Sequence, residues 1–213
     1  MKQACAAKLK TMSSFSAHTR TTKKRTYRLG KRAEKQDETR RRIVEAAVDL
    51  HCTLGPARTT VSQIAERAGV QRHTYYAHFA DERSLFLACS ALALERDPLP
   101  EVEQLFAVPS GRERLRRGLR LFYEWFERNE DHAACVLRDA DHHALTREMV
   151  ELRIAPTFSR AAEIMGEGLD DRSRTLLGVA LDFACWRNLS SALSAASAAA
   201  LMSDAVVRVT SGV

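Results

Sequence analysis

Apolar residues recur at helical spacing along most of the chain beyond residue 36, and no segment shows the strict alternation of a β-strand over a useful length. The first helix is expected to begin after an N-cap at Asp37 and to end at Gly55-Pro56. Its apolar stripe consists of Ile43, Ala47, Leu50 and Leu54. The folded body of the chain is therefore predicted to be all-α.

Two short helices joined by a tight turn follow. Thr60 and Gln63 match a capping box at the start of the first helix, and Gly69 provides the residue that can reverse the chain at its end. The second helix is expected over Gln71 to Phe79, with Tyr75 and Phe79 facing the core. A second helix with an outward polar face, after a glycine turn, is the geometry that places a recognition helix in the major groove of DNA.

A further helix, capped by Asp81, is expected to run to Arg96, where Pro98 and Pro100 break it. We take this break as a domain boundary, with a DNA-binding domain over 37–97 and a helical domain over 98–213. Helices in the second domain are expected at about 111–128, up to 138, over 141–166 with a kink or split at Pro156, over 172–189 and over 195–209.

Positive charge is concentrated at the N-terminus. Residues 1–36 hold seven lysines and four arginines against one glutamate, a net charge of +10, so that the rest carries −4 of the total +6. We interpret this segment as a flexible basic arm that neutralises DNA phosphates or enters a minor groove. The alternative is a solubilising leader, and Met12 is another possible start.

Several classes of protein are not supported by the sequence. The five cysteines are scattered without a Cys-x-x-Cys pair, which favours a reducing cytoplasm and argues against disulfides or structural zinc. No apolar run is long enough to span a membrane, and no signal peptide is recognised. Neither a glycine-rich phosphate loop nor a nucleophile elbow is found, so we expect neither an enzyme nor a cofactor.

The segment from Thr59 to Phe79, TTVSQIAERAGVQRHTYYAHF, resembles the signature of the TetR (tetracycline repressor) family. Its Thr-Thr, Ile-Ala-x-x-Ala-Gly-Val, Thr-x-Tyr and His-Phe elements occur together in register, and the resemblance covers roughly residues 39–87. It implies a helix-turn-helix DNA-binding domain and a larger C-terminal domain that dimerises and binds an effector. Ala77, His73 and Glu82 depart from residues that are common in the family at those positions.

The resemblance also implies which side chains meet DNA. Gln71, Arg72 and His73 would reach base edges, and Arg72 is the leading specificity residue because a guanidinium can pair with guanine O6 and N7. The side chains expected near phosphates are Thr60, Thr74, Tyr76 and His78.

Family members dimerise through their last two long helices, so the homodimer contact is expected within about 172–209. A pocket for a small apolar or aromatic ligand is expected inside the helices between 111 and 189. Its candidate walls are Phe122, Tyr123, Trp125, Phe126, Phe158, Phe183 and Trp186, although many of these aromatic residues would simply fill the core. Ligand binding would release the protein from a pseudo-palindromic operator.

Some features have competing interpretations. A metal-site interpretation of His132, His142, His143, Cys135, Asp139 and Asp141 is weaker than one of exposed polar residues in loops and helix ends, so no metal is expected. The arginines from Arg112 to Arg120 could suggest a second nucleic-acid patch, but they are interpreted as lying mostly on the solvated face of a helix, without a DNA role. Cys89 and Cys135 are interpreted as buried, inert thiols. A ligand-independent architectural DNA-binding protein remains the alternative function.

Overall fold

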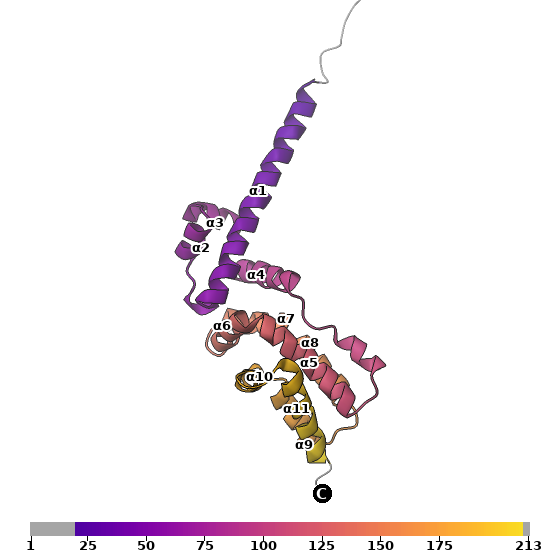
Figure 1. Cartoon of the computed structure of the whole chain (residues 1–213). Helices are drawn as coiled ribbons and strands as arrows, with labels where there is room; N and C mark the ends of the chain where they lie inside the picture. Colours follow the sequence, from indigo (N-terminus) through magenta and orange to yellow (C-terminus); the bar gives the residue numbers. More distant parts are fainter. Residues whose placement is uncertain (1–19, 211–213) are drawn as a thin grey trace, which may run out of the picture. The chain divides into compact units, whose positions relative to one another are not determined.

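The computed structural model describes the backbone of residues 20–210 and the side chains of residues 30–209. Every regular element in this part of the chain is helical (Figure 1), which confirms the all-α prediction. The first elements are α1 (Arg20–Thr53), the 3₁₀ turn η1 (Pro56–Arg58), α2 (Val61–Arg67), α3 (Arg72–His78) and α4 (Glu82–Arg96). They are followed by η2 (Val102–Ala107), α5 (Arg112–Arg128), α6 (Glu130–Ala140), α7 (Ala144–Arg153), α8 (Ala155–Met165), α9 (Asp171–Ala180), α10 (Phe183–Ser190) and α11 (Ala195–Thr210).

The first helix begins earlier than the sequence pattern predicts. α1 runs from Arg20 through Asp37 without a break, so the predicted N-cap at Asp37 is wrong, and residues 20–36, expected to be flexible, are helical. Residues 20–36 contain no proline and are rich in lysine and arginine, which have high helix propensity, so nothing there ends the helix. The described residues up to Arg40 and those from Arg41 onward belong to separate compact units, and residues 1–19 of the predicted arm lie outside the described residues.

A small core joins the second half of α1 to α2, α3 and α4. The predicted capping box is present at Thr60, and Gly69 adopts φ 66°, the left-handed conformation that the turn between α2 and α3 requires. Asp81 caps α4 by accepting a hydrogen bond from the Ser84 amide at 2.7 Å. The buried side chains of this core are Ile43, Val44, Ala46, Ala47, Val48, Ile64, Ala68, Tyr75, Phe79, Leu85 and Cys89.

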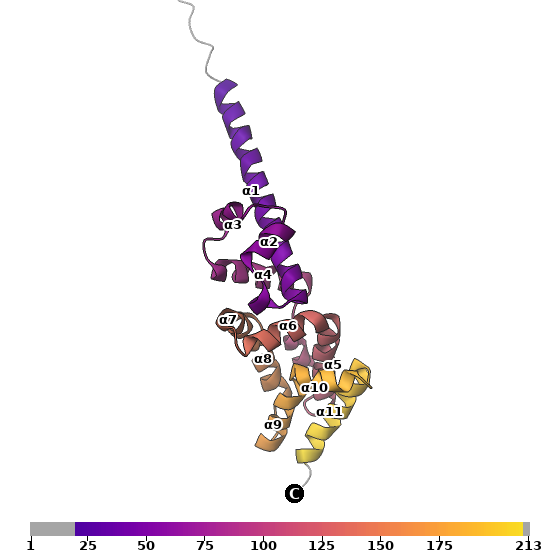
Figure 2. The same ribbon diagram turned by 90° about the vertical axis from the view of Figure 1, so that its left-hand side faces the viewer.

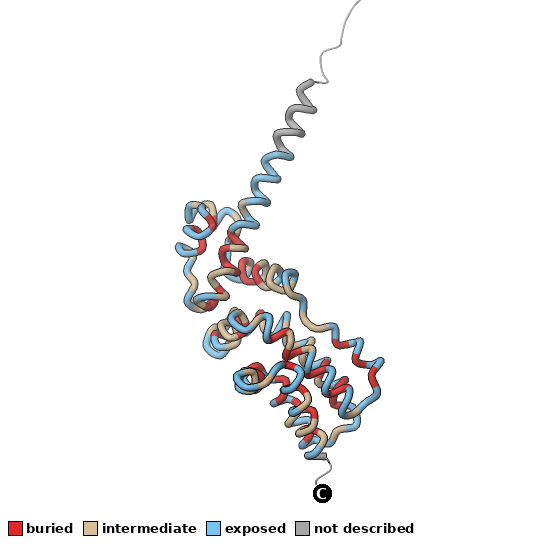
Figure 3. The backbone as a smooth tube through the Cα atoms, in the orientation of Figure 1, coloured by how far each residue is buried: buried red, intermediate tan, exposed pale blue. Residues whose placement is uncertain are grey.

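A larger core follows Pro98 and is centred on α5. This helix contributes Leu115, Leu119 and Phe122, which are fully buried, and it packs against α11, α10 and α8 (Figure 2). Buried positions therefore follow the inner side of α5, and exposed positions its outer side (Figure 3). Arg114 departs from this pattern, because it is buried and donates hydrogen bonds to the Val108 and Ile164 carbonyls. The other arginines of the run, Arg112, Arg116, Arg117 and Arg120, are exposed, in agreement with the interpretation that the run lies mostly on a solvated face.

Two predicted helices are divided. The segment with Pro156 splits into α7 and α8 at Ile154, as expected from the missing amide of proline. The single helix predicted over 172–189 is wrong, because α9 ends at Ala180 and α10 begins after Asp182. The Asp182 carboxylate caps α10, and the Tyr123 hydroxyl donates to the Ala180 carbonyl at 2.8 Å. The break is thus stabilised by a side chain from another helix.

Candidate DNA-recognition surface and ligand cavity

α3 presents a polar surface whose position is set by two buried aromatic residues. Tyr75 and Phe79 are buried with their ring centroids 5.9 Å apart, which confirms their predicted place in the core. On the other sides of the helix Gln71, Arg72, His73 and Tyr76 are exposed, and Thr74 and His78 are half-buried. The anchored helix therefore holds these polar groups in one fixed arrangement, available to a macromolecule outside the chain.

Arg72 and Tyr76 are exposed on α3, where their polar groups can reach a partner outside the chain. The Arg72 side chain makes no hydrogen bond or ion pair within residues 30–209. Tyr76 is 50% exposed and meets the edge of the Tyr75 ring at 5.3 Å between centroids. A guanidinium and a phenol hydroxyl held on one exposed helix are groups that bond base edges and phosphates.

Thr60 lies at the start of α2, where the sequence places a phosphate contact. Its hydroxyl accepts a hydrogen bond from the Gln63 amide at 3.3 Å and donates to Gln63 Oε1 at 2.8 Å, while Gln63 Oε1 also accepts from the Thr60 amide. The residue is exposed. Its first role is therefore to stabilise the beginning of α2, and any contact with DNA would be added to that role.

A buried carboxylate connects α6 to the end of α1. Asp139 is 1% exposed and accepts hydrogen bonds from the Ala57 amide at 2.9 Å and from Arg138 Nε at 2.9 Å. Arg138 also donates to the Leu54 carbonyl at 3.3 Å. Gly55 has φ 95°, and a Cβ atom there would lie 2.4 Å from the Asp139 carboxylate. Only glycine therefore permits this close approach, and we call the contact the Asp139 tether.

The tether corrects the interpretation of the histidine and aspartate cluster. Asp139 was expected to be an exposed polar residue, but it is buried because it holds the α1–η1 turn. His132 is also not on the surface, since it is half-buried and lines a cavity. Among the residues that the structure describes, no group of three potential ligands is arranged to hold a metal ion.

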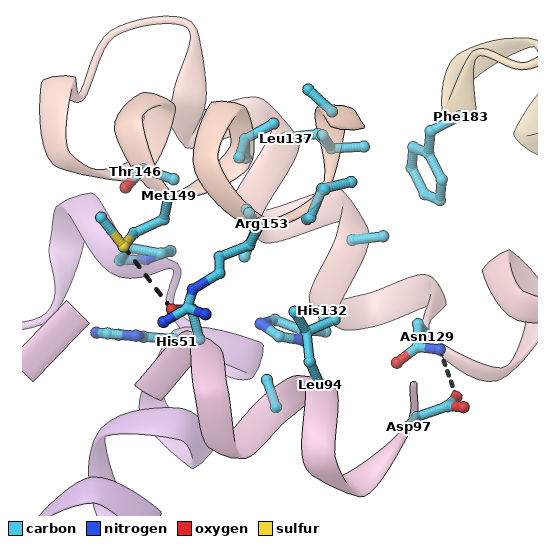
Figure 4. A pocket seen from close by; sticks show the side chains of 18 of the residues that line it. His51, Leu94, Asp97, Asn129, His132, Leu137, Thr146, Met149, Arg153 and Phe183 are labelled. Carbon is cyan, nitrogen blue, oxygen red and sulfur yellow. Dashed lines mark hydrogen bonds between the residues drawn. The ribbon is translucent and has the colours of Figure 1, made fainter. Parts of the chain in front are cut away.

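A cavity of about 260 Å³ lies between α4 and the helices α5 to α8 (Figure 4). This volume is close to the lower end of the range of about 300–1,000 Å³ found for small-molecule sites. Most of its lining is apolar, with polar groups at a few positions. The wall is formed by Val48, His51, Pro56, Phe86, Cys89, Ser90, Ala93, Leu94, Asp97, Trp125, Phe126, Asn129, His132, Ala133, Val136, Leu137, Thr146, Met149, Val150, Arg153, Ile154, Ala155, Phe158, Leu181, Asp182 and Phe183.

The aromatic residues predicted for a pocket divide into two groups. Trp125, Phe126, Phe158 and Phe183 line the cavity. The other three, Phe122, Tyr123 and Trp186, do not line it, and the prediction is corrected there. They are at most 2% exposed and fill the centre of the larger core, where the Trp186 ring packs 5.6 Å from that of Phe126.

Sequence reasoning missed the part of the wall that comes from α1 and α4. Val48, His51 and Phe86 belong to the segment that also carries the recognition surface. The available signal was a second face on α4, where Phe86, Ser90 and Ala93 recur at helical spacing beside the stripe of the smaller core. That face contacts the cavity, so residues of the two predicted domains share one site.

Two histidines at the cavity are held in an environment that favours the neutral ring. Burial lowers the pKa of His51 from 6.5 to about 4, and repulsion from His132 adds to the effect while Asp139 opposes it. Burial likewise lowers the pKa of His132. The His51 ring lies 5.2 Å from that of Phe86. At neutral pH these imidazoles therefore offer hydrogen bonds without charge.

Comparisons with known proteins match the segment that contains α2 and α3. Residues 43–89 match the family described as bacterial regulatory proteins, tetR family. Over 69 residues the chain is 38% identical to the HTH-type transcriptional regulator SrpR of Pseudomonas putida, covering 32% of each chain. Over 105 residues it is 25% identical to the uncharacterized HTH-type transcriptional regulator YerO of Bacillus subtilis (strain 168), covering 48% of this chain and 36% of that one. The matches thus span about a third of these relatives' length.

Similarity in fold covers more of the chain than the sequence match over residues 43–89. The transcriptional regulator FadR from Bacillus subtilis, solved with stearoyl-CoA, superposes with a TM-score of 0.55 at 19% identity, over 78% of this chain and 96% of that one. The helix-turn-helix motif, the family match over residues 43–89 and the related sequences show that this segment is similar to the DNA-binding segment of TetR-family transcriptional regulators. Within residues 20–210 no helix is both long and apolar enough to cross a membrane.

Proposed function

We propose that this chain acts as a homodimeric repressor that binds a pseudo-palindromic operator and leaves it when a small apolar or aromatic ligand enters the cavity. The observation that carries the proposal is the shared wall of the cavity, since α1 and α4 of the DNA-binding segment line it together with α5 to α8. A ligand there touches both parts of the protein. Because the operator lies on the bacterial chromosome, we expect the protein in the cytoplasm.

On the operator, each protomer would insert α3 into a major groove. Gln71, Arg72 and His73 stand at the start of that helix, where family members contact base edges. Thr60, Thr74, Tyr76 and His78 would contact the phosphates and so fix the position of the helix. Support comes from the exposed Arg72 side chain, which makes no hydrogen bond or ion pair within residues 30–209.

Dimerisation would use the C-terminal helices within about 172–209. Val179 of α9 and Leu201 of α11 are large apolar side chains that are each 51% exposed. Val179 also belongs to a shallow hollow, which is lined by Thr175, Gly178, Val179, Asp182, Ala184, Cys185, Asn188 and Leu189. A twofold arrangement would cover these apolar groups and set the spacing of the two recognition helices.

The ligand can act on DNA binding only by preferring one of two conformations. Its effect would pass through α6, because this helix lines the cavity with His132, Ala133 and Leu137 and holds the α1–η1 turn through Asp139. A small displacement of α6 would therefore change where α1 ends and how the recognition helices are separated. This coupling distinguishes the proposal from a ligand-independent architectural protein.

The first experiment measures operator binding by fluorescence anisotropy with DNA flanking the gene of this protein and with excess competitor DNA. We expect saturable binding that resists the competitor, and Arg72→Ala should reduce base discrimination at one operator position by about 5- to 150-fold. Arg116→Ala, an exposed change away from α3, is the matched control. Binding no tighter than to random DNA would overturn the proposal.

The same assay tests the basic segment and the ligand response. Deleting residues 1–35 should weaken binding to all DNA sequences and flatten its salt dependence, because fewer counterions are then released. An unchanged salt slope would remove the segment from the interface. A panel of apolar small molecules should contain compounds that release the operator, whereas operator binding indifferent to all of them would favour the architectural alternative.

A further inference from the structure

The charged residues that line the cavity differ in whether they have hydrogen-bond partners. Three of its lining residues carry a formal charge at neutral pH: Asp97, Arg153 and Asp182. Asp97 accepts hydrogen bonds from Arg128 at 3.2 Å and from Asn129 at 2.6 Å. Asp182 caps the start of α10 by accepting the Ala184 amide at 2.7 Å, where the helix dipole stabilises its charge. Both carboxylates therefore have partners.

Arg153 has no such partner. It lies in the last turn of α7, and its side chain makes no hydrogen bond or ion pair within the part of the chain whose side chains are described. Figure 4 shows its side chain reaching from α7 into the cavity, with Asp97 and Asn129 well apart from it. The residue is exposed as well as part of the lining, so the guanidinium stands at an opening of the cavity. An incoming anion would meet it without displacing an internal carboxylate.

The rest of the wall suits an apolar body. Phe86 comes from α4, Phe126 from α5 and Phe158 from α8, and the Phe126 and Phe158 rings lie 5.9 Å apart. His51 and His132 add polar groups that are neutral at pH 7, so they do not compete for the anion as second cations. The cavity thus combines aromatic surface with the Arg153 guanidinium, which has no ion-pair partner among the side chains of residues 30–209.

We propose that the cavity binds a small apolar acid, whose carboxylate pairs with Arg153 and whose body lies against Phe86, Phe126 and Phe158. This inference names the chemical class of the ligand. Only the claim that the ligand releases the operator rests on the proposed function. A guanidinium can bind a carboxylate through two parallel hydrogen bonds, which an amide or an alcohol of equal size cannot match. A cation of the same shape would meet repulsion from Arg153.

The test is calorimetric titration of the full chain with three matched probes: 4-phenylbutanoate, 4-phenylbutanamide and 4-phenylbutylamine. We expect the acid to bind about 10- to 100-fold more tightly than the amide, with the amine weakest. Arg153→Gln should abolish the difference between acid and amide while leaving amide binding unchanged. Arg147→Gln, an exposed change on the same helix outside the cavity, is the control and should keep the preference for the acid.

Two results would overturn the inference: no preference for the acid in the unchanged protein, including no binding of any probe, or an undiminished preference in Arg153→Gln. Circular dichroism of both variants checks that the helical fold is retained. Operator binding is measured separately on the same samples. Acid binding that depends on Arg153, in a protein that does not bind the operator, would support the ligand class and refute the proposed function. Operator binding without such acid binding would refute the ligand class alone.

Discussion

The recognition surface and the cavity are built in different ways. The recognition surface comes from about twenty consecutive residues, in which α2, a glycine turn and α3 set one another's positions. The cavity draws its wall from α1 and α4 to α8, with a few residues before and in α10, so its parts are separated by more than a hundred residues. A surface of the first kind depends on local capping and a small core. A site of the second kind depends on the packing of the whole unit.

This difference has consequences for mutation. A change on the exposed side of α3 should remove a DNA contact and leave folding almost intact, because the side chain has few neighbours. Around the cavity, polar residues such as His51 and Asp139 are buried, so their removal should affect stability as well as ligand response. The following expectations test that distinction, in decreasing order of effect.

Adjacent tyrosines on α3 give the largest contrast. Tyr75→Ala removes a buried ring from the smaller core and should lower the free energy of unfolding by about 3–5 kcal/mol. Tyr76→Ala removes a ring that is 50% exposed and should change it by less than about 0.5 kcal/mol, while weakening operator binding. Urea unfolding and anisotropy measure the two effects. Equal destabilisation by both variants would contradict the assignment of the two faces.

The neutral His51 should make stability depend on pH. Its pKa is lowered from 6.5 to about 4 in the folded protein, so the unfolded chain binds a proton first as the pH falls. The stabilisation is complete above pH 6.5 and is lost toward pH 4, by at most about 3 kcal/mol. His51→Gln should reduce this loss in urea titrations at pH 7.5 and 5.0, leaving a smaller effect in the same direction from His132.

The Asp139 tether should couple stability to ligand response. Asp139→Ala leaves the Ala57 amide without its acceptor and should destabilise the protein by about 1–3 kcal/mol, whereas Asp141→Ala, on the exposed surface nearby, should not. Operator release by a ligand found in the panel should also weaken in Asp139→Ala. Unchanged unfolding and unchanged release would show that the contact between α6 and the α1–η1 turn carries no energy.

The smallest expected effect concerns the cap of α2. Thr60→Ala removes the hydroxyl that bonds the Gln63 amide and should cost about 1 kcal/mol, whereas Thr60→Ser keeps it and should cost little. If Thr60 also touches a phosphate, the alanine variant should bind DNA less tightly even after the difference in stability is allowed for. Thermal unfolding and anisotropy on both variants separate the two roles.

The sequence by itself determined the helical class and the local structure of the helix-turn-helix, while the role of α3 in DNA recognition stays a prediction. Capping at Thr60, the reversal at Gly69 and the buried pair of Tyr75 and Phe79 depend on residues within a few turns of one another, where local rules of capping and periodicity apply. The end of α1 before Gly55 and the split near Pro156 follow from the same local rules. The early start of α1 at Arg20 shows their limit, since a good N-capping residue such as Asp37 does not by itself mark the beginning of a helix.

Only the tertiary structure decided where the cavity lies and which side chains reach it. Aromatic residues on one amphipathic helix look alike in sequence, yet Trp125 lines the cavity and Phe122 fills the core. The burial of Asp139 depends on a turn far away in the chain, and the break before α10 depends in part on the Tyr123 hydroxyl. Such features arise from contacts between distant segments, and no periodicity within a single segment encodes them.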